Sequence, residues 1–522
     1  MVVAGILIGL CAAVVYLGPQ LLSSYVLKDK IERVAADRLH VDLKLATFHL
    51  SIFPRLRIQF TGVVLRKPDR PDLPPLIQID KCSVEAGIFA LLEHRPHLHR
   101  LDMQGLTINV PPRESPQDAG EKADRNNRKP FRTDFIIDQI TSDQMTLNIL
   151  HRNGGNPLVF LLHKLRIDSF QPDKPAAFHA NLTNPKPEGE IQTHGEFGPW
   201  NPDNPSQTPV SGNYIFSHAD LGTIKGIRGT LSSQGIFSGV LDYIQVRGKT
   251  ETPNFELSVS RHPMPLNTQF DAIVDGMNGN TILNTIDVQL FNSQLIAKGE
   301  VAKGPRQPGR AVTLNVVADA ARIQDLLRVA VKSDKPLLTG LASLNTQFVI
   351  PSKNAKNTDI ANRLDLKGQF GIVSARFTTP TVQDKVNALS RRGRGRPHNT
   401  DDSSAVSRLT GKFTLRNGLI DFSKLTFDVA GASIRLNGSY DLNTEALNFR
   451  GTLSLKAKLS QTTTGIKSLF LKMIDPLFAK KDAGAVLPIK ITGTREKPSF
   501  GLDMGRIFAR TESSSAAVRS GQ

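Results

Sequence analysis

The stretch A-S-I-R-L-N-G-S-Y-D-L-N-T-E-A-L-N-F-R-G-T-L-S-L-K-A-K-L, from Ala432 to Leu459, decides the fold. In both of its halves apolar side chains alternate with polar ones, which is the period of a β-strand with one apolar face. The halves are separated by Asn443 to Ala446, a short polar segment rich in residues that tolerate tight turns. The stretch therefore predicts a long antiparallel hairpin. Its apolar face must be covered either by more protein or by a ligand.

The apolar positions of this hairpin and of the strand expected near residue 414 are the candidate ligand-binding residues. Their polar neighbours Arg435, Asn437, Arg450 and Ser454 are expected to face water, because successive side chains of a strand point to opposite faces. The candidates are Phe413, Leu415, Ile434, Leu436, Tyr440, Leu442, Phe449, Leu453 and Leu455.

Composition limits the class of partner. The chain has 522 residues, enough for two to four domains or one elongated repetitive structure. Lys and Arg outnumber Asp and Glu by 65 to 48, for a net charge of +17. Such a balance suits nucleic acid, a membrane surface or an envelope polyanion, and equally an ordinary solvated basic surface. The two cysteines, Cys11 and Cys82, offer neither a disulfide framework nor metal-ligand spacing.

Residues 1–27 predict a transmembrane anchor. No charged side chain occurs from Val2 to Leu27, and at ~1.5 Å per residue this run spans about 39 Å, more than a ~30 Å hydrocarbon core. The lack of a small-residue cleavage site favours a retained anchor over a signal peptide. The nearest basic residues, among them Lys28 and Lys30, follow the run, and the positive-inside bias alone would place the large domain in the cytoplasm.

The rest of the chain is expected to be mainly β. Roughly 20 to 25 short alternating runs, such as Met145-x-Leu147-x-Ile149, are separated by turns rich in Pro and Gly. Residues 28–110 form a first segment that opens with a short helix at 29–39, and residues 111–134 form an exposed linker. Residues 135–508 form the repetitive β domain, and residues 509–522 a disordered tail.

Helical periodicity is rare. It occurs at 320–331, at 382–389 and most clearly at 464–478, where one apolar stripe is flanked by lysines. This last helix is expected to cap the end of a sheet or to contact an anionic membrane. Its stripe consists of Ile466, Leu469, Phe470, Met473, Ile474, Leu477 and Phe478.

The common enzyme signatures are missing from the sequence. There is no G-x-S-x-G elbow, phosphate-binding loop or H-E-x-x-H motif, so neither catalysis nor a cofactor is expected. Three histidines, His94, His97 and His99, fall within six residues. Pro96 lies among them and no acidic or cysteine ligand of matching spacing stands nearby, so they are interpreted as part of a solvated loop and not as a metal site.

One motif is of a type that binds nucleic acid. The segment R-R-G-R-G-R-P, from Arg391 to Pro397, contains a core that fits an A·T-rich minor groove. It occurs once and is followed by the acidic segment N-T-D-D-S-S. It is therefore interpreted as a flexible basic loop that meets phospholipid headgroups or another anion, and nucleic acid is not an expected partner.

A sheet with one apolar face and few helices can form a sandwich, close as a barrel or curl into a gutter. A gutter of ~20 strands at ~4.8 Å spacing would be about 100 Å long. The predicted architecture is an elongated, curled antiparallel sheet with a few short capping helices, following the N-terminal transmembrane helix.

The chain resembles the AsmA-like proteins of Gram-negative bacterial envelopes. The resemblance lies in the membrane helix, the short helix and the strand series L-A-T-F-H-L-S-I-F-P-R-L-R-I-Q-F-T-G-V-V-L at 45–65. It continues in I-R-G-T-L-S-S-Q-G-I-F-S-G at 227–239, in 434–441 and in 459–500. It covers most of the chain outside the 111–134 linker and the tail, in arrangement and not in any catalytic signature.

This resemblance implies an inner-membrane anchor and a large periplasmic β-rich domain related to the grooves of eukaryotic bridge-like lipid transporters. It also implies a role in moving phospholipid to the outer membrane, or in maintaining that membrane. The leading hypothesis is a non-enzymatic protein that binds phospholipid in an apolar β-groove, with an outer-membrane or envelope protein as a further partner. The alternative is a non-transporting scaffold for envelope or outer-membrane protein assembly, whose β core is filled by its own side chains.

Overall fold

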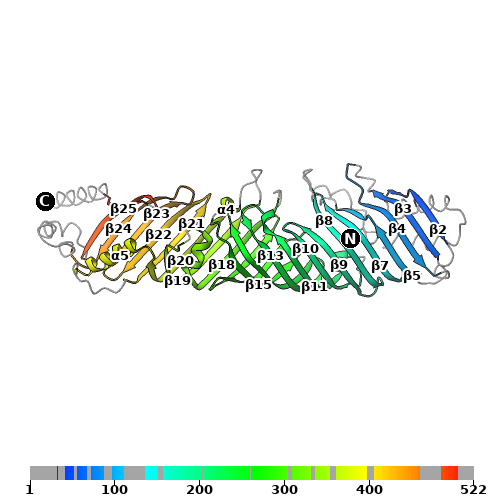
Figure 1. The fold of residues 1–522 in the computed structure, drawn as a ribbon, viewed down its shortest axis with the longest axis horizontal. Helices are drawn as coiled ribbons and strands as arrows, with labels where there is room; N and C mark the ends of the chain where they lie inside the picture. The colour runs from blue at the N-terminus through cyan, green and yellow to red at the C-terminus, as the bar shows by residue number, and fades with distance from the viewer. Residues whose placement is uncertain are drawn as a thin grey trace, which may run out of the picture. The chain divides into compact units, whose positions relative to one another are not determined.

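The computed structural model describes residues 32, 42–51, 56–66, 72–87, 97–110, 136–150, 157–201, 204–258, 260–303, 309–330, 335–352, 360–396, 405–458, 484–495 and 497–503. Within these ranges the protein is mainly β, with strands β1 to β26 and a few short helices (Figure 1). The predicted fold class is confirmed at this level. The chain divides into two compact units.

The first unit comprises residues 1–223, 230–250 and 271–279. Its strands are β1 (Asp42–Lys44), β2 (Thr47–Ser51), β3 (Leu56–Arg66), β4 (Ile77–Ala86), β5 (His97–Gln104), β6 (Thr107–Val110), β7 (Ile136–Ile149), β8 (Leu158–Phe170), β9 (Ala176–Pro185), β10 (Glu188–Phe197), β11 (Pro209–Asp220) and β13 (Thr230–Val240). Short 3-10 turns lie at Pro205–Gln207 and Leu221–Thr223.

Strand pairing in the first unit is antiparallel with one exception. Strands β5 and β6 both pair with β7 in parallel, so the expectation of a purely antiparallel sheet is wrong here. A parallel pair needs a connection of about a dozen residues or more, because the chain must return to the same edge before the next strand begins. Residues 111–135, between β6 and β7, are long enough for that return.

The first unit contains a continuous hydrophobic core, built from one face of β1 to β9. Strand β3 shows how the sequence places it: Leu56, Ile58 and Phe60 alternate inward, and the phase then shifts by one residue at Gly62, so that Val63 and Leu65 also point inward. Gly62 has a φ of 57°, which a residue with a Cβ adopts only with strain. Phe60, at the centre of this core, is 0% exposed.

The second unit comprises residues 224–229, 251–270 and 280–522. Strands β14 (Tyr243–Leu257) and β15 (Met264–Val274) contribute residues to both units. Its other strands are β12 (Ile227–Arg228), β16 (Thr281–Leu290), β17 (Ser293–Ala302), β18 (Ala311–Arg322), β19 (Leu338–Ile350), β20 (Asp365–Phe377), β21 (Ser407–Arg416), β22 (Leu419–Val429), β23 (Ala432–Asp441), β24 (Ala446–Leu455), β25 (Ala485–Thr494) and β26 (Pro498–Leu502).

From β16 to β26 each strand pairs antiparallel with the next, which is the hairpin succession expected from the alternating runs. The helices of this unit are α3 (Ile323–Ala330), α4 (Ile360–Arg363) and α5 (Pro380–Gly393). Helices α3 and α5 confirm the helical periodicity at 320–331 and 382–389.

Several predicted segments lie outside the described residues. They are the anchor at 1–27, the linker at 111–134, the tail at 509–522 and the helix at 464–478 with its stripe; of the helix at 29–39, only Glu32 is described. Among the described residues, none of the helices has the length and apolar character needed to cross a membrane.

Candidate functional site

Strands β20 to β25 place most of their apolar side chains on one face of the sheet, which we call the apolar face. Residues directly opposite one another on neighbouring strands share a face, so the register sorts them into rows. Four rows follow from the pairing: Leu366, Leu415, Ile420, Tyr440 and Leu447; Gly368, Phe413, Phe422, Gly438, Phe449 and Ile491; Phe370, Gly411, Leu425, Leu436, Gly451 and Ile489; and Ile372, Leu409, Phe427, Ile434, Leu453 and Leu487.

The intervening positions on the same strands carry polar and charged side chains. Lys412 lies opposite Lys424, and Asn437 opposite Arg450, and all four are exposed. Arg435 is exposed as well, as the alternation of the hairpin predicts. The sheet from β20 to β25 therefore has one apolar and one polar face.

Four phenylalanines form the centre of the apolar face. The ring centroids of Phe370 and Phe413 are 6.1 Å apart, those of Phe413 and Phe422 6.5 Å, and those of Phe422 and Phe449 5.8 Å. These separations lie in the range of favourable aromatic contacts. We call this set the phenylalanine cluster; it links strands β20, β21, β22 and β24.

Glycines on the apolar face make room for these rings. Gly438 of β23 lies directly between Phe422 and Phe449 in the register, so the two rings meet across it. It has a φ of 145°, and a Cβ there would lie 2.1 Å from the backbone oxygen of Asn448. Gly411 lies opposite Phe370, whose ring a Cβ would approach to 2.6 Å. The glycines of these strands are thus part of the packing of the face.

Burial differs between the core of the first unit and the apolar face. The core side chains are at most 8% exposed, whereas apolar side chains farther along the same unit, such as Phe178, Ile191 and Phe216, are half-buried. In the apolar face most side chains are only half-buried, including Phe370, Phe413, Phe422 and Leu436, although Phe449 is 6% exposed. Lateral neighbours alone bury part of a side chain on a sheet, whereas a second layer of protein removes nearly all of its exposure. Within the part of the chain that the structure describes, the apolar face is therefore incompletely covered by protein.

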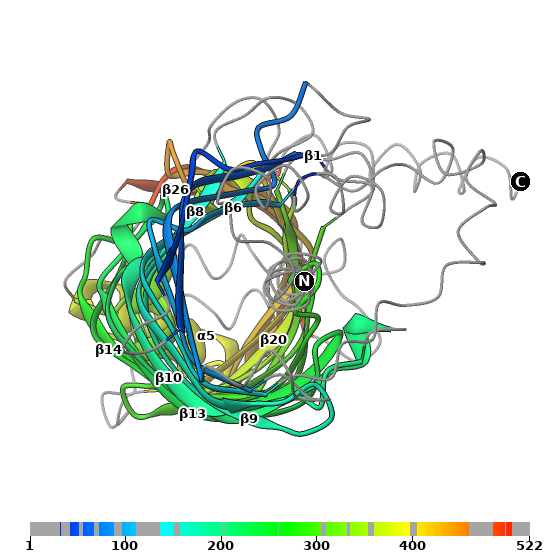
Figure 2. The same cartoon turned by 90° about the vertical axis from the view of Figure 1, so that its right-hand side faces the viewer.

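Two helices cover one edge of this face. Leu389 of α5 packs with Ala432, Leu455 and Ala485, where β23 begins, β24 ends and β25 begins. The Ser390 hydroxyl donates a 2.9 Å hydrogen bond to the Ala430 carbonyl oxygen and holds α5 there. In both views α5 lies against the yellow strands of this unit (Figure 1, Figure 2).

Helix α3 covers the neighbouring part of the same edge. Its Ile323 and Leu326 pack against a small core of Ala342, Ile372 and Ala375. Helices α3 and α5 thus correspond to short capping helices expected from the sequence. Among the described residues, no helix packs against the phenylalanine cluster beyond its Phe370 edge.

Tyr440 brings a hydroxyl to the opposite edge of the apolar face. Burial raises the pKa of Tyr440. The negative charges of Glu445 and Asp441 also raise this pKa, whereas the positive charge of Arg495 lowers it. The phenol therefore stays neutral at physiological pH. Arg495 is itself paired with Glu445 at 3.1 Å.

The structure brings eight of the nine predicted ligand-binding residues together on strands β21, β23 and β24. Seven of them lie in the four rows of the apolar face, and Leu455 lies in the row next to α5. The ninth, Leu442, lies just beyond β23, where its N–H donates to the Gly418 carbonyl oxygen. All nine are buried or half-buried.

Sequence reasoning missed Phe370, Phe422, Ile489 and Ile491. Phe422 was obscured because Ser423 and Lys424 interrupt the alternation of β22, where the register with β21 shifts between Lys412 and Phe413. The apolar alternation in L-P-I-K-I at 487–491 was the available signal for the two isoleucines.

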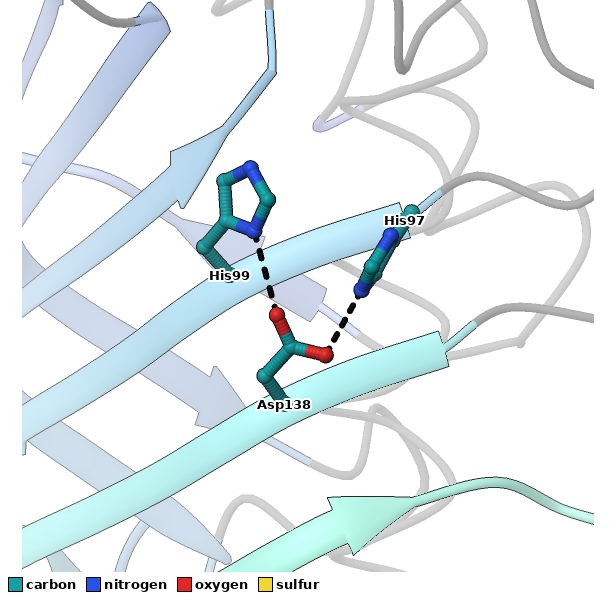
Figure 3. A group of neighbouring side chains, drawn as sticks. All are labelled: His97, His99 and Asp138. Carbon is teal, nitrogen blue, oxygen red and sulfur yellow. Dashed lines mark hydrogen bonds and ion pairs between the residues drawn. The ribbon is translucent and has the colours of Figure 1, made fainter.

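The histidine segment was interpreted wrongly. His97 and His99 lie on β5 and not in a loop, and Asp138 of the neighbouring β7 supplies the acidic group that the local sequence lacks (Figure 3). His97 Nε2 lies 2.6 Å from Asp138 Oδ1, and His99 Nδ1 lies 3.1 Å from Asp138 Oδ2. The interpretation failed because residues 39 positions apart meet only through the parallel pairing of β5 with β7. His94 lies outside the described residues.

The arginine motif is also not a flexible loop over its described part. Arg391 and Arg392 form the last turn of α5, and the Arg396 N–H donates a 3.0 Å hydrogen bond to the Arg391 carbonyl oxygen. Gly393 packs so closely that a Cβ would lie 2.4 Å from the Gly431 carbonyl oxygen. These basic residues belong to an ordered helix end that is docked on the sheet.

Comparisons of the chain with protein families, with curated proteins and with solved structures found no match.

The difference in burial predicts different costs for removing a phenylalanine. Phe60→Ala should lower the free energy of unfolding of the first unit by about 3–5 kcal/mol, because it opens a cavity in a closed core. Phe422→Ala should cost only about 1–2 kcal/mol, because its ring is half-buried on an incompletely covered face.

Urea denaturation followed by two signals separates these effects. Trp200, the single tryptophan, belongs to the first unit and reports its unfolding by fluorescence, while circular dichroism reports the strands of both units. Equal costs for the two substitutions would contradict the proposed difference between a closed core and an open face.

Proposed function

We propose that this protein is a membrane-anchored, non-enzymatic lipid-binding protein whose apolar face shelters phospholipid acyl chains. The observation that carries the proposal is the phenylalanine cluster on a half-buried apolar face, backed by a polar face on the same strands. Acyl chains fit such a surface because apolar contact is non-directional and aromatic rings offer large contact areas.

The energetic benefit of such a face is large. A phospholipid carries roughly 30 methylene groups, and at ~0.8 kcal/mol each its acyl chains cost over 20 kcal/mol to expose to water. A surface that replaces most of that water contact lowers the barrier to moving the lipid between two membranes. Continuous apolar rows across β20 to β25 are what such movement needs, because the chains never have to leave apolar contact.

The proposal includes an architecture and a location. The sheet would curl so that its apolar face lines a groove, residues 2–27 would anchor the protein in the inner membrane, and the β-rich part would lie in the periplasm. The quoted similarity to AsmA-like proteins and the uncharged run at 2–27 support this arrangement. Phospholipid would then move between the inner and outer membranes, with an outer-membrane or envelope protein as a further partner.

A second candidate is a non-transporting scaffold for envelope assembly. The closed core of the first unit favours it, because there the same strand alternation is satisfied by protein alone. The two candidates differ in what the apolar face of the second unit contacts: lipid in the first, and other parts of this protein or a protein partner in the second.

Substitution of neighbouring residues on opposite faces tests the lipid-binding proposal. Leu436→Glu places a carboxylate on the apolar face, and Asn437→Glu places the same group on the polar face one residue away. With a photoreactive amino acid at Phe449, we expect the full-length protein to crosslink to phospholipid and Leu436→Glu to reduce the yield about tenfold or more, because a charge is poorly tolerated against acyl chains. Asn437→Glu should leave the yield unchanged.

Thermal unfolding of the same variants decides between the candidates. On an open face the carboxylate reaches water, so Leu436→Glu should keep its fold. Under a layer of protein the same substitution would cost several kcal/mol. Unfolding of Leu436→Glu, together with no lipid crosslink in the parent protein, would exclude lipid binding and leave the scaffold.

The proposed location has its own test. Protease added to spheroplasts should degrade the β-rich part while the inner membrane stays intact. Complete protection in spheroplasts, with cleavage only in inverted vesicles, would place this part in the cytoplasm, as the basic residues Lys28 and Lys30 alone suggest.

A further inference from the structure

The polar face of the first unit carries three side chains whose donor atoms converge. His97 and His99 lie on the same strand, β5, and Asp138 lies on β7, its parallel neighbour. One nitrogen from each imidazole and a carboxylate oxygen all lie within 4.8 Å of one another. Figure 3 shows the two rings reaching the two oxygens of the same carboxylate. Between the polar positions, Leu98 and Ile137 point into the core and fix the two strands.

We propose that His97, His99 and Asp138 bind one divalent zinc-class cation. Two imidazoles and a carboxylate are ligands that Zn²⁺ uses, whereas Mg²⁺ and Ca²⁺ favour sites made of oxygen atoms alone. Metal–ligand distances of ~2.0–2.1 Å in a tetrahedron place donor atoms about 3.3 Å apart. His97 Nε2 lies 2.6 Å from Asp138 Oδ1, and His99 Nδ1 lies 3.1 Å from Asp138 Oδ2. The two imidazoles thus contact different oxygens of the carboxylate, and small side-chain rotations would bring one oxygen and both nitrogens to the tetrahedral spacing.

The site can adjust to the ion and remain open to solvent. The exposed fractions of the three side chains are 38% for His97, 45% for His99 and 49% for Asp138, so small rotations meet little resistance. Three protein ligands leave the fourth tetrahedral position to water or to a group from a partner.

The contacts of Asp138 differ from those of the carboxylates around it. Carboxylates on the surrounding strands are engaged by arginines: Asp102 by Arg100, Asp168 by Arg166 and Glu85 by Arg57. Asp138 is instead approached by imidazoles, which become metal ligands when neutral.

A bound cation would link β5 to β7, which pair in parallel in the first unit. His99 and Asp138 are 39 residues apart, and the chain between them includes the long connection from β6 to β7. A cation that binds the folded state and not the unfolded chain raises the stability of the first unit. Zinc should therefore raise the melting temperature.

The test is calorimetric titration of Zn²⁺ into the full-length, chelator-treated protein without a histidine tag. We expect one site, with binding weakened at least about 100-fold in each of His97→Ala, His99→Ala and Asp138→Asn, since loss of a ligand should cost at least as much as loss of an outer-shell partner. The matched control is His179→Ala, whose exposed ring stacks on His194 at 5.7 Å across β9 and β10. It should bind zinc as the parent does.

Two further measurements test the assignment of the metal ligands. Co²⁺ should give a visible absorption band in the parent and in His179→Ala that is lost in Asp138→Asn, and Mg²⁺ should not compete with Zn²⁺. Melting temperatures in chelator confirm that the variants are folded. Absence of zinc binding in the parent, or equal binding in the parent and all three ligand variants, would overturn the site. Loss of binding in His179→Ala alone would place the metal at β9 and β10 instead.

Discussion

Successive side chains of a β-strand point to opposite faces, and the rest of this structure depends on that constraint. With apolar residues at every second position over many strands, the chain must produce a sheet with one apolar face. The N-terminal strands of the first unit satisfy this face with their own side chains, in a core that runs from Leu43 to Ala176. In the second unit α3 and α5 pack along one edge, and most side chains of the phenylalanine cluster remain half-buried. One pattern thus gives a closed core and an incompletely covered surface.

Local alternation made the strands and the hairpin of the second unit predictable. Strands β23 and β24 pair as the 432–459 stretch indicates, with a turn at 442–445 in which Asp441 accepts hydrogen bonds from the Asn443 and Thr444 N–H groups. What could not be predicted depends on distant pairing or on local irregularity. The parallel pairing of β5 and β6 with β7 joins strands that are distant in sequence, so local patterns do not reveal it. This pairing brings Asp138 to His97. Phe422 was hidden by the irregular stretch at Ser423 and Lys424.

Glycine positions connect the sequence to the proposed function. Gly438 and Gly411 appear in the sequence as breaks in apolar runs, and periodicity alone gives them no role. In the structure they lie opposite or between phenylalanines, where a Cβ would clash with backbone or ring atoms. They let the rings approach across a strand, so that the apolar surface is continuous from β20 to β24. A surface for acyl chains has to be continuous, because each polar interruption would add a desolvation cost for the lipid.

The two proposals concern different faces and different units, so evidence against one leaves the other unaffected. The zinc-class site lies on the polar face of the first unit, where charge and hydrogen bonding dominate, and the lipid proposal rests on apolar rows of the second. A metal at β5 and β7 would stabilise the unit with the closed core and leave the apolar face unchanged. The half-buried apolar rows of the described second unit therefore remain the feature that the function has to explain.

The central claim is that lipid and not protein completes the apolar face of the second unit. Its most direct measurement is mass spectrometry of lipids extracted from the full-length protein after purification in detergent and extensive washing. An open face that binds acyl chains predicts stoichiometric phospholipid retained by the folded protein. Folded, monomeric protein that carries no phospholipid, and that takes up none when returned to phospholipid vesicles, would contradict it.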